Sequence, residues 1–259
     1  MRFHLHLKCE KGLLLSFNYQ YSIASWIYSR IEAGSKEFSA WLHEKGYISG
    51  TRTFKLFTFY FQPGKYAIEN GKMRFLSDDA TLMVSFIPAD IPEHFVSGLF
   101  QNANMLLHNE GTTAGFAVSN VALEKEVVFN DSVVFEAKSP IVLSIPVEKS
   151  GKLVHNYIDP NESEYAVRLV TNLVRKYCAI HPDHPEFLPD YKFSVVSQPK
   201  SRLVTIRSGQ NSESKVRGFL FRFRLSAPPE LLRVGYYGGF GEQNSMGFGA
   251  VELKGGKNG

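Results

Sequence analysis

The sequence predicts an α+β protein made of two tandem βαββαβ domains, with a glycine-rich loop in the second domain. Three observations lead to this prediction. The 259 residues are enough for two domains of roughly 130 residues each. Strand-like and helix-like segments follow one another in the same order in the two halves of the chain. Apolar residues make up 44% and charged residues 21% of the sequence, as in a folded globular protein.

The first half begins with a strand and two helices. Arg2–Lys8 alternates between apolar and polar side chains, which is typical of a half-buried strand. Apolar residues at helical spacing over 23–31 predict a helix that ends at Gly34. Ser35 is placed to cap a second, short helix that ends near Gly46. The later elements of this half are expected to be strands over 54–61, 73–76 and 81–87, a helix over 90–100, and further strands up to Phe129.

The second half repeats this order. Its expected elements are a strand over 133–146, an amphipathic helix over 162–177, strands over 192–196, 202–207 and 216–225, a short helical turn over 228–232, and a strand over 247–253. Two such halves imply two α+β sandwiches side by side, in the ferredoxin-like (RRM-like) arrangement. The predicted boundary lies near Asn130–Asp131, which gives an N-terminal domain of residues 1–130 and a C-terminal domain of residues 131–259.

Several classes of protein do not fit the sequence. No apolar run approaches the ~18 residues that a membrane-spanning helix needs. The alternating first residues differ from the continuous apolar stretch of a signal peptide. Cys9 and Cys178 are too few for a disulfide framework or a zinc cage. We therefore expect a cytoplasmic protein that does not contact a membrane and holds no metal.

The positive charge is concentrated in one part of the chain. The whole sequence carries a net charge of +4, but the segment from Ser197 to Arg233 carries +6 and the remainder −2. The basic residues of this segment are Lys200, Arg202, Arg207, Lys215, Arg217, Arg222, Arg224 and Arg233. Such asymmetry favours an anionic partner, with nucleic acid as the leading candidate. The alternative is a solvated basic face without a partner.

Arginines and phenylalanines alternate over 217–225. The three phenylalanines are expected to be buried against the helices, which leaves Arg222 and Arg224 on the open sheet face, about 7 Å apart by strand rise. Two more arginines, on the strand expected beside this one, would complete a phosphate-binding stripe. The predicted stripe consists of Arg202, Arg207, Arg222 and Arg224. The alternative is a solubilising hairpin whose arginines contact only water.

The segment from Gly235 to Leu253 is rich in glycine. Glycines permit positive φ and let backbone N–H groups approach a phosphate closely. A dinucleotide-binding fingerprint is excluded, because Gly239-Phe240-Gly241 is followed by Asn244 where a third glycine is required. The alternative is a loop that only leads into a terminal strand. The residues of the segment expected to bind RNA are Gly239, Gly241, Ser245 and Gly247.

Histidines offer candidates for proton transfer. His43 ends the second short helix, and histidine has an unperturbed pKa of ~6.5, which suits proton transfer near neutrality. A lone histidine after an apolar stripe is more often structural, so the residue type alone leaves both interpretations open. His4 and His6 share one face of the first strand. No third ligand is near them in the sequence, so they are interpreted as RNA contacts or plain surface residues.

Taken together, these residues resemble the CRISPR-associated repeat-processing endoribonucleases of the RAMP superfamily, and the resemblance covers the whole chain. Its strongest part is the glycine-rich segment. The N-terminal half contributes Phe17-Asn18-Tyr19-Gln20-Tyr21, Trp26-Ile27-Tyr28, Trp41-Leu42-His43-Glu44 and Phe54-Lys55-Leu56-Phe57-Thr58. In the family pattern a tyrosine, a histidine and a lysine form the catalytic group, which by position implies Tyr28, His43 and Lys55. Relatives often carry Lys or Arg in the loop where this chain has Gln243.

The resemblance implies a metal-independent endoribonuclease without cofactors that binds CRISPR repeat RNA and cleaves precursor crRNA. The ribose 2′-OH would attack the scissile phosphate and give 2′,3′-cyclic phosphate and 5′-OH ends. His43 would act as general base or acid, Tyr28 would orient the 2′-OH, and Lys55 would offset the developing negative charge. Other CRISPR-associated proteins of an effector complex are further candidate partners.

Two alternative functions remain at this point. The first is a catalytically silent RNA-binding subunit of such a complex, and relatives of that kind lack the histidine. The second is a generic RNA-binding protein with exposed aromatic residues on its central strands.

Overall fold

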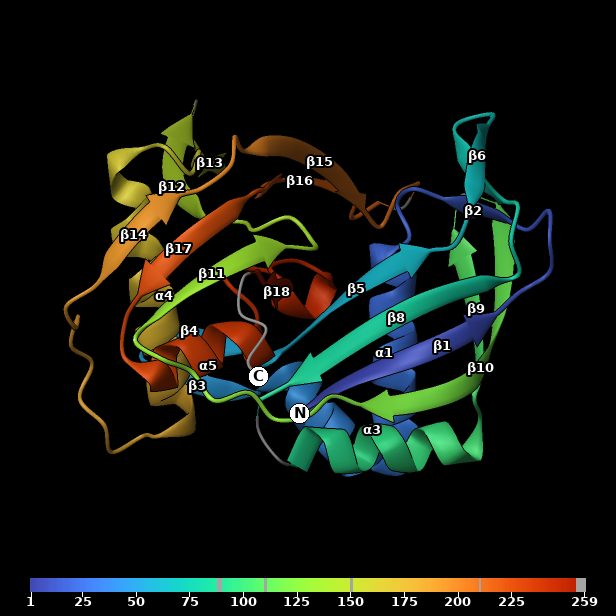
Figure 1. The fold of residues 1–259 in the computed structure, drawn as a ribbon, viewed down its shortest axis with the longest axis horizontal. Helices are drawn as coiled ribbons and strands as arrows, with labels where there is room; N and C mark the ends of the chain where they lie inside the picture. Colours follow the sequence, from blue (N-terminus) through green and yellow to red (C-terminus); the bar gives the residue numbers. More distant parts are fainter. Residues whose placement is uncertain (88–89, 110, 150, 210, 255–259) are drawn as a thin grey trace.

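Two antiparallel sheets lie side by side in the computed structural model, and each is covered by helices (Figure 1). The structure describes residues 1–87, 90–109, 111–149, 151–209 and 211–254. None of the helices within these ranges combines the length and the apolar character needed to cross a membrane. The α+β class predicted from the sequence is confirmed.

The N-terminal sheet has the strand order β5-β8-β1-β10-β9. Apart from the edge strand β9, this order places the first strand of a βαββαβ unit between the third and the fourth, as in a ferredoxin-like fold. Its strands are β1 (Arg2–Lys8), β5 (Phe57–Pro63), β8 (Asp79–Phe86), β9 (Asn104–Asn109) and β10 (Thr112–Leu123). The helices of this half are α1 (Gln20–Gly34), α2 (Lys36–Glu44) and α3 (Asp90–Gln101).

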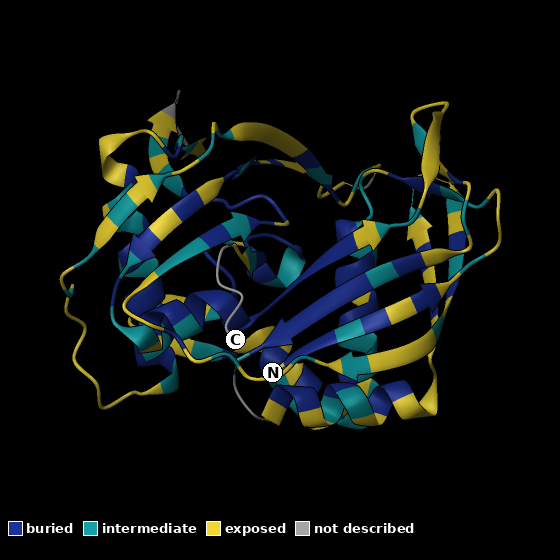
Figure 2. Ribbon diagram, viewed as in Figure 1, coloured by how far each residue is buried: buried dark blue, intermediate teal, exposed yellow. Residues whose placement is uncertain are grey.

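The C-terminal sheet has the order β14-β17-β11-β18, which is the same arrangement of four strands. Its strands are β11 (Ser132–Ala137), β14 (Lys192–Val195), β17 (Arg222–Ser226) and β18 (Val251–Leu253). The helices of this half are α4 (Ser163–Ile180), α5 (Pro229–Gly238) and the single 3₁₀ turn η1 (Asn244–Met246). Helix α5 is buried over most of its length (Figure 2).

Short strands outside the two main sheets form hairpins and one small sheet. The small sheet is β2 (Leu14–Ser16), β7 (Lys72–Phe75) and β6 (Tyr66–Glu69). The paired strands are β3 (Tyr47–Ser49) with β4 (Arg52–Phe54), β12 (Ser144–Lys149) with β13 (Lys152–Tyr157), and β15 (Lys200–Ile206) with β16 (Ser214–Leu220). The β15–β16 hairpin extends from the C-terminal sheet toward the N-terminal half (Figure 1).

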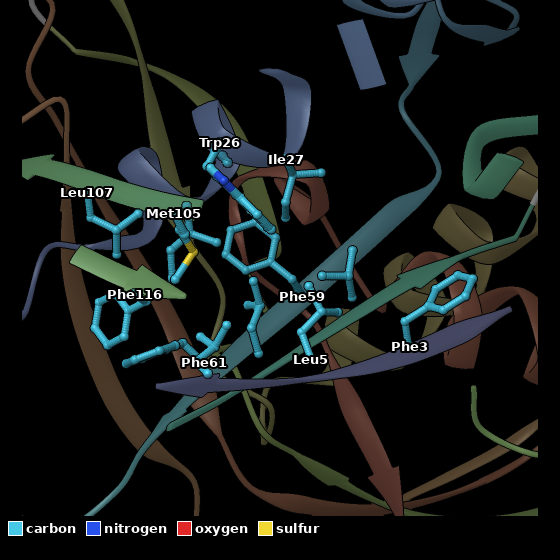
Figure 3. Close-up of a cluster of buried hydrophobic side chains, with 14 of the residues drawn as sticks. Phe3, Leu5, Trp26, Ile27, Phe59, Phe61, Met105, Leu107 and Phe116 are labelled. Carbon is cyan, nitrogen blue, oxygen red and sulfur yellow. The ribbon is translucent and has the colours of Figure 1, made fainter. Parts of the chain in front are cut away.

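The first core fills the space between the N-terminal sheet and its helices (Figure 3). The alternation of β1 explains it: Phe3 and Leu5 point to the helices, and Leu5 lies in register with Leu82 of β8. Helices α1 and α3 approach closely because Gly98 has no side chain. A Cβ at Gly98 would lie 1.8 Å from the carbonyl oxygen of Arg30.

The second core lies between the C-terminal sheet and helices α4 and α5. Phe135 and Phe223 of neighbouring strands pack against Phe240 of the glycine-rich segment, with ring centroids 4.9 and 5.2 Å from that ring. Helix α4 contributes Leu169 and Leu173 to the same core, and both are fully buried. The glycine-rich segment is therefore partly a core element.

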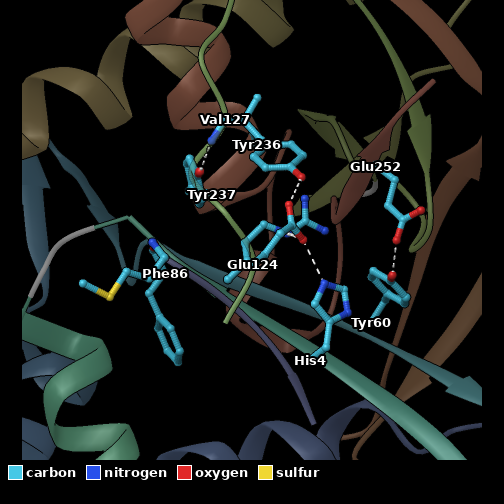
Figure 4. Close-up of polar contacts among 10 residues, drawn as sticks. His4, Tyr60, Phe86, Glu124, Val127, Tyr236, Tyr237 and Glu252 are labelled. Carbon is cyan, nitrogen blue, oxygen red and sulfur yellow. Dashed lines mark hydrogen bonds and ion pairs between the residues drawn. The ribbon is translucent and has the colours of Figure 1, made fainter. Parts of the chain in front are cut away.

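Polar contacts join the two halves (Figure 4). Glu124, which follows β10, accepts a hydrogen bond from the hydroxyl of Tyr236 on α5, and its other oxygen lies 2.8 Å from the His4 ring. Tyr60 of β5 donates its hydroxyl hydrogen to Glu252 of β18. His4 is thus half-buried and paired with a carboxylate.

The predicted extent of one strand in each half was wrong. The strand expected over 54–61 is divided between β4 and β5, because Leu56 adopts the left-handed region with φ 54° and turns the chain from a hairpin into the sheet. The strand expected over 133–146 is divided between β11 and β12. The chain between them leaves the sheet, and Ile141 forms an isolated bridge with Phe219.

The predicted end of the chain also differs from the structure. The strand expected over 216–225 is interrupted at Phe221, between β16 and β17. The helical turn expected over 228–232 is the longer helix α5. The strand expected over 247–253 shortens to β18, because Gly247 and Gly249 have positive φ values of 84° and 74° that no strand accommodates.

Candidate functional site

Tyr28, His43 and Lys55 come together in the structure. The rings of Tyr28 on α1 and His43 on α2 meet edge to face, with centroids 5.7 Å apart. The Lys55 ammonium donates a hydrogen bond of 2.7 Å to the main-chain oxygen of His43. The site therefore combines an imidazole, a phenol and an ammonium from three different elements.

His43 occupies the last turn of a helix whose start is well defined. Ser35 caps α2 as predicted, since its hydroxyl oxygen accepts the Phe38 backbone N–H at 3.2 Å. Leu42 is fully buried and fixes the helix against the first core. His43, the next residue, points away from that core and is exposed. The imidazole is thus accessible to a substrate, while its backbone is held.

Tyr28 is suited to donate a hydrogen bond. Burial raises the pKa of its hydroxyl to about 12, and a hydrogen bond with Ser245 partly offsets that shift. The ring also packs against Phe57 of β5, with centroids 5.4 Å apart. Because the phenol stays protonated near neutral pH, it can orient a substrate oxygen but does not act as a base there.

Lys55 lies in the short link between β4 and β5. Its ammonium binds the carbonyl end of α2, where the helix dipole favours a positive charge. Burial lowers the pKa of Lys55 from its ordinary value. Lys55 therefore supports the end of the helix and places a cation beside His43.

The glycine-rich segment begins inside α5 and becomes a loop only at Gly239. A Cβ at Gly241 would lie 2.3 Å from the Val142 carbonyl oxygen, and a Cβ at Gly247 would lie 2.7 Å from the Phe59 ring. Gly239, Gly241 and Gly247 are all buried, so their closest neighbours are parts of the protein itself. Their contact with RNA stays a prediction.

Ser245 connects this loop to the catalytic candidates. It lies in η1, is half-buried, and hydrogen bonds with Tyr28. The Thr58 hydroxyl on β5 donates a second hydrogen bond to the loop, 2.9 Å to the Phe248 carbonyl oxygen. Gln243, where relatives often carry a cation, is exposed. Two of the predicted groups, catalytic and loop, thus form one site.

A basic cleft of about 510 Å³ opens beside this site, between α4, the β3–β4 hairpin and the loop. Lys55 and Ser245 are among the residues that line it. The other cationic side chains of its lining are Arg52, Arg168 and Arg175, together with the buried Lys176. No pattern in the sequence predicted this cleft. Arg168 and Arg175 are seven residues apart and so share a helix face, but only the fold brings that face to the β3–β4 hairpin.

The prediction of one continuous arginine stripe was wrong. Arg222 and Arg224 are exposed on β17, as expected, and the phenylalanines between and before them are buried. The neighbours of β17 are β11 and β14, whereas Arg202 belongs to β15, which pairs with β16. Arg207 lies at the far end of that hairpin, 5.3 Å from the ring centroid of Tyr21 on α1. Arg202 and Arg207 therefore belong to a different hairpin from the strand that carries Arg222 and Arg224, and the four do not form one stripe.

Within the described ranges, no three or more His, Cys, Asp and Glu side chains gather in a way that would hold a metal ion. The exposed His155 is among the residues that line the basic cleft, whereas the exposed His181 and His184 are not. His181 and His184 flank a proline-containing turn and pack on Tyr177, with ring centroids 4.4 and 5.0 Å away.

Comparison with protein families covers almost the whole chain. Residues 14–122 match the family model described as CRISPR-associated protein Cas6, N-terminal, and residues 123–253 match CRISPR associated protein Cas6, C-terminal. A curated relative from Methanocaldococcus jannaschii, CRISPR-associated endoribonuclease Cas6 1, is 28% identical over 253 residues. That alignment covers 97% of this chain and 92% of the relative.

Solved structures share the fold over nearly the full length. A Cas6-related protein from Pyrococcus furiosus superposes with a TM-score of 0.83 at 25% identity, covering 98% of each chain. A structure described as a RAMP protein binding different RNA substrates has a TM-score of 0.82 at 25% identity, covering 98% of this chain and 100% of that one. These likenesses confirm the predicted tandem ferredoxin-like architecture.

Proposed function

Because this chain belongs to the Cas6 family of CRISPR-associated proteins, we propose that it is an endoribonuclease that binds CRISPR repeat RNA and cleaves precursor crRNA. The observation that carries this proposal is the meeting of Tyr28, His43 and Lys55 at an exposed site beside the glycine-rich loop. The M. jannaschii relative, which bears the name endoribonuclease, supports it.

The proposed reaction is a transesterification within the RNA. The 2′-oxygen forms a bond to the adjacent phosphorus, and the bond from phosphorus to the 5′-oxygen of the next nucleotide breaks. The 2′-OH gives up its proton and the 5′-oxygen gains one, so the products carry a 2′,3′-cyclic phosphate and a 5′-OH. Exposed His43 serves as general base or acid, and each such proton transfer typically contributes about 10²–10⁴-fold.

Tyr28 and Lys55 have supporting roles in this proposal. The protonated Tyr28 hydroxyl donates a hydrogen bond that orients the 2′-OH or a phosphate oxygen. The Lys55 ammonium offsets the negative charge that develops on the phosphorane. The reaction draws its nucleophile from the RNA and its proton transfer from histidine, so we propose that it proceeds without a metal ion.

The RNA is proposed to contact both halves of the protein. The proposed contacts outside the catalytic group are Arg202, Arg207, Arg222, Arg224, Gly239, Gly241, Ser245 and Gly247. The exposure of all four arginines supports their proposed contact with RNA.

We also propose that the domains divide near Asn130–Asp131 and that the protein acts in the cytoplasm. Other CRISPR-associated proteins of an effector complex are proposed as further partners.

The structure disfavours the two alternatives. A catalytically silent subunit has no need for an exposed histidine packed against a tyrosine at the loop. A generic RNA-recognition protein needs aromatic rings on the open face of its sheet, but Phe221 and Phe223 are buried against the helices.

Cleavage of the host's own repeat RNA tests the proposed function. The protein is incubated with labelled repeat RNA in EDTA, and with a matched RNA that carries a 2′-deoxy nucleotide immediately upstream of the cut. We expect full cleavage of the first RNA and no cleavage of the second. Loss of activity in EDTA would refute the metal-independent mechanism, and cutting of the deoxy RNA would refute 2′-OH attack.

A further inference from the structure

Lys176 of α4 is a lysine in an interior position. Its side chain is 1% exposed, on the helix face that also carries Leu169 and Leu173. Lysine is almost never fully buried unless it is paired. Burial lowers the pKa of Lys176 to about 7, and the nearby Glu242 carboxylate opposes that shift. Packing alone therefore does not explain why a lysine occupies this buried position.

The Lys176 ammonium is surrounded by oxygen atoms of the glycine-rich loop. It donates hydrogen bonds of 2.6 Å to the Gly239 carbonyl oxygen, 2.8 Å to the Gly241 carbonyl oxygen and 2.7 Å to Oδ1 of Asn244. Three acceptors match the three N–H bonds of an ammonium, whereas a neutral amine would leave one acceptor without a donor. The loop thus curls around a single buried cation.

Asn244 extends this arrangement to the rest of the loop. Its Oδ1 accepts from Lys176, and its Nδ2 donates two hydrogen bonds of 3.0 Å, to the carbonyl oxygens of Phe240 and Phe248. Lys176 and Asn244 together satisfy four carbonyl groups of the loop that point inward. Since buried carbonyls without donors are costly, these two side chains define the shape of the loop.

The shape of the loop sets the position of a residue at the catalytic site. Ser245 directly follows Asn244 and hydrogen bonds with Tyr28, whose ring packs against His43. A continuous set of contacts therefore runs from Lys176 in the C-terminal half to the candidate catalytic group in the N-terminal half. A displacement of about 1 Å at a catalytic group can lower a rate by about a hundredfold.

We propose that Lys176 is a positioning residue for RNA cleavage, because its buried ammonium holds the glycine-rich loop in the shape that presents Ser245 to Tyr28. This inference rests on the proposed function for its catalytic consequence. Its structural consequence, the order of the loop, does not depend on cleavage and is tested separately.

The first measurement is amide hydrogen exchange over residues 239–249 in the full-length protein without RNA. Lys176→Met keeps the length of the side chain and removes the ammonium, and Lys11→Met, at an exposed turn, is the control for loss of one positive charge. We expect faster exchange of the loop amides in Lys176→Met alone, with strands β1 and β17 unchanged. Wild-type exchange of the loop in Lys176→Met overturns the proposal.

The second measurement separates positioning from general stability. We expect single-turnover cleavage by Lys176→Met to fall by about tenfold, as for loss of the hydrogen bond between Ser245 and Tyr28, and RNA affinity to fall much less. A double variant with Ser245→Ala should cleave no more slowly than Lys176→Met alone, because both changes disrupt the same contact with Tyr28. Additive losses, or a loss of affinity as large as the loss of rate, would overturn the positioning role.

A variant of the loop itself, Asn244→Ala, tests the proposal if Lys176→Met does not fold. Asn244→Ala removes the second member of the arrangement and leaves α4 unaltered, so the same exchange and cleavage results are expected from it. An Asn244→Ala protein with a wild-type loop and a wild-type cleavage rate would contradict the proposal. If the wild-type protein itself cleaves no repeat RNA, the proposed function fails, and the exchange measurement still decides the role of Lys176.

Discussion

Helices α1 and α4 occupy the same position in the two halves, since each is the first helix of its βαββαβ unit. Both reach the glycine-rich loop. Helix α1 does so with Tyr28, a half-buried phenol that hydrogen bonds with Ser245 and packs against the exposed His43. Helix α4 does so with Lys176, a fully buried ammonium. One helix offers reactive groups to a substrate, and the other supports the loop from within.

This difference shows how one fold is used twice for different purposes. The two sheets have the same strand order, so topology does not determine which half performs chemistry. The segments added to each sheet determine which half performs chemistry. The N-terminal half adds α2 and the β3–β4 hairpin, which bring His43 and Lys55 together, and the C-terminal half adds the loop and the basic β15–β16 hairpin. We therefore expect variants of the first half to slow cleavage and variants of the exposed arginines and buried glycines of the second half to weaken binding. Variants of Lys176, Asn244 and Ser245 are the exception, because these residues act through Tyr28 of the first half.

The largest effect is expected at His43. His43→Ala should lower the single-turnover cleavage rate at least about a hundredfold, because a proton-transfer group is removed, while repeat affinity stays within a few-fold. His181→Ala, an exposed histidine remote from the site in sequence and packed on Tyr177, is the matched control and should cleave normally. Unchanged cleavage by His43→Ala would remove the assignment of chemistry to the N-terminal half.

The next effect concerns the loop itself. Gly241 has φ 71°, and a Cβ there would lie 2.3 Å from the Val142 carbonyl oxygen, so Gly241→Val must distort the loop. The expected result is a loss of RNA affinity of about tenfold or more, with a salt dependence of binding that is nearly unchanged. Fluorescence anisotropy at several salt concentrations measures both quantities. Normal binding by this variant would show that the loop shape does not matter for RNA.

Predictions from the sequence were correct where a local pattern determines the structure. Alternation predicted β1 and the burial of Phe221 and Phe223, and a side-chain cap predicted the start of α2 at Ser35. Predictions from the sequence were wrong where a contact between residues distant in the chain determines the structure. The break at Leu56 depends on a non-glycine residue in the left-handed region, beside a lysine anchored to the end of a helix.

The same limit applies to the site. Tyr28, His43 and Lys55 were named from the family resemblance, and the structure shows them near one another. Lys176 was missed because a lysine is ordinarily assigned to the surface. One signal was present: Lys176 follows Leu169 by seven residues and Leu173 by three, which places it on the apolar face of α4. Its acceptors lie some 65 residues later in the chain, so only the fold identifies its role.

A comparable effect on binding is expected for the arginines of β17. Replacing Arg222 and Arg224 together with Ala should weaken RNA binding by about tenfold or more, since their charge-assisted hydrogen bonds to phosphates are removed. The log–log salt slope should flatten by roughly 0.7 for each single-strand phosphate that is no longer neutralised. The fold should survive, because the apolar face of the strand, with Phe223 at its centre, is untouched. Wild-type affinity at physiological salt would show that this surface is only solvated.

The smallest effect is expected at Tyr28 and tests how the two halves meet. Tyr28→Phe keeps the ring against His43 and Phe57 but removes the hydroxyl that hydrogen bonds with Ser245. Because burial raises the pKa of this hydroxyl to about 12, it remains protonated across the working range and cannot supply a titration there. Tyr28→Phe should therefore lower the single-turnover rate by about tenfold, the effect of removing one hydrogen bond, and leave the shape of the pH–rate profile unchanged.

Ser245→Ala, which removes the hydrogen-bond partner of Tyr28 from the C-terminal half, should give a similar decrease in rate. The double variant should be no slower than either single variant. A pH profile that changes shape in Tyr28→Phe would mean that the tyrosine transfers a proton, and the chemistry would then be shared between α1 and α2.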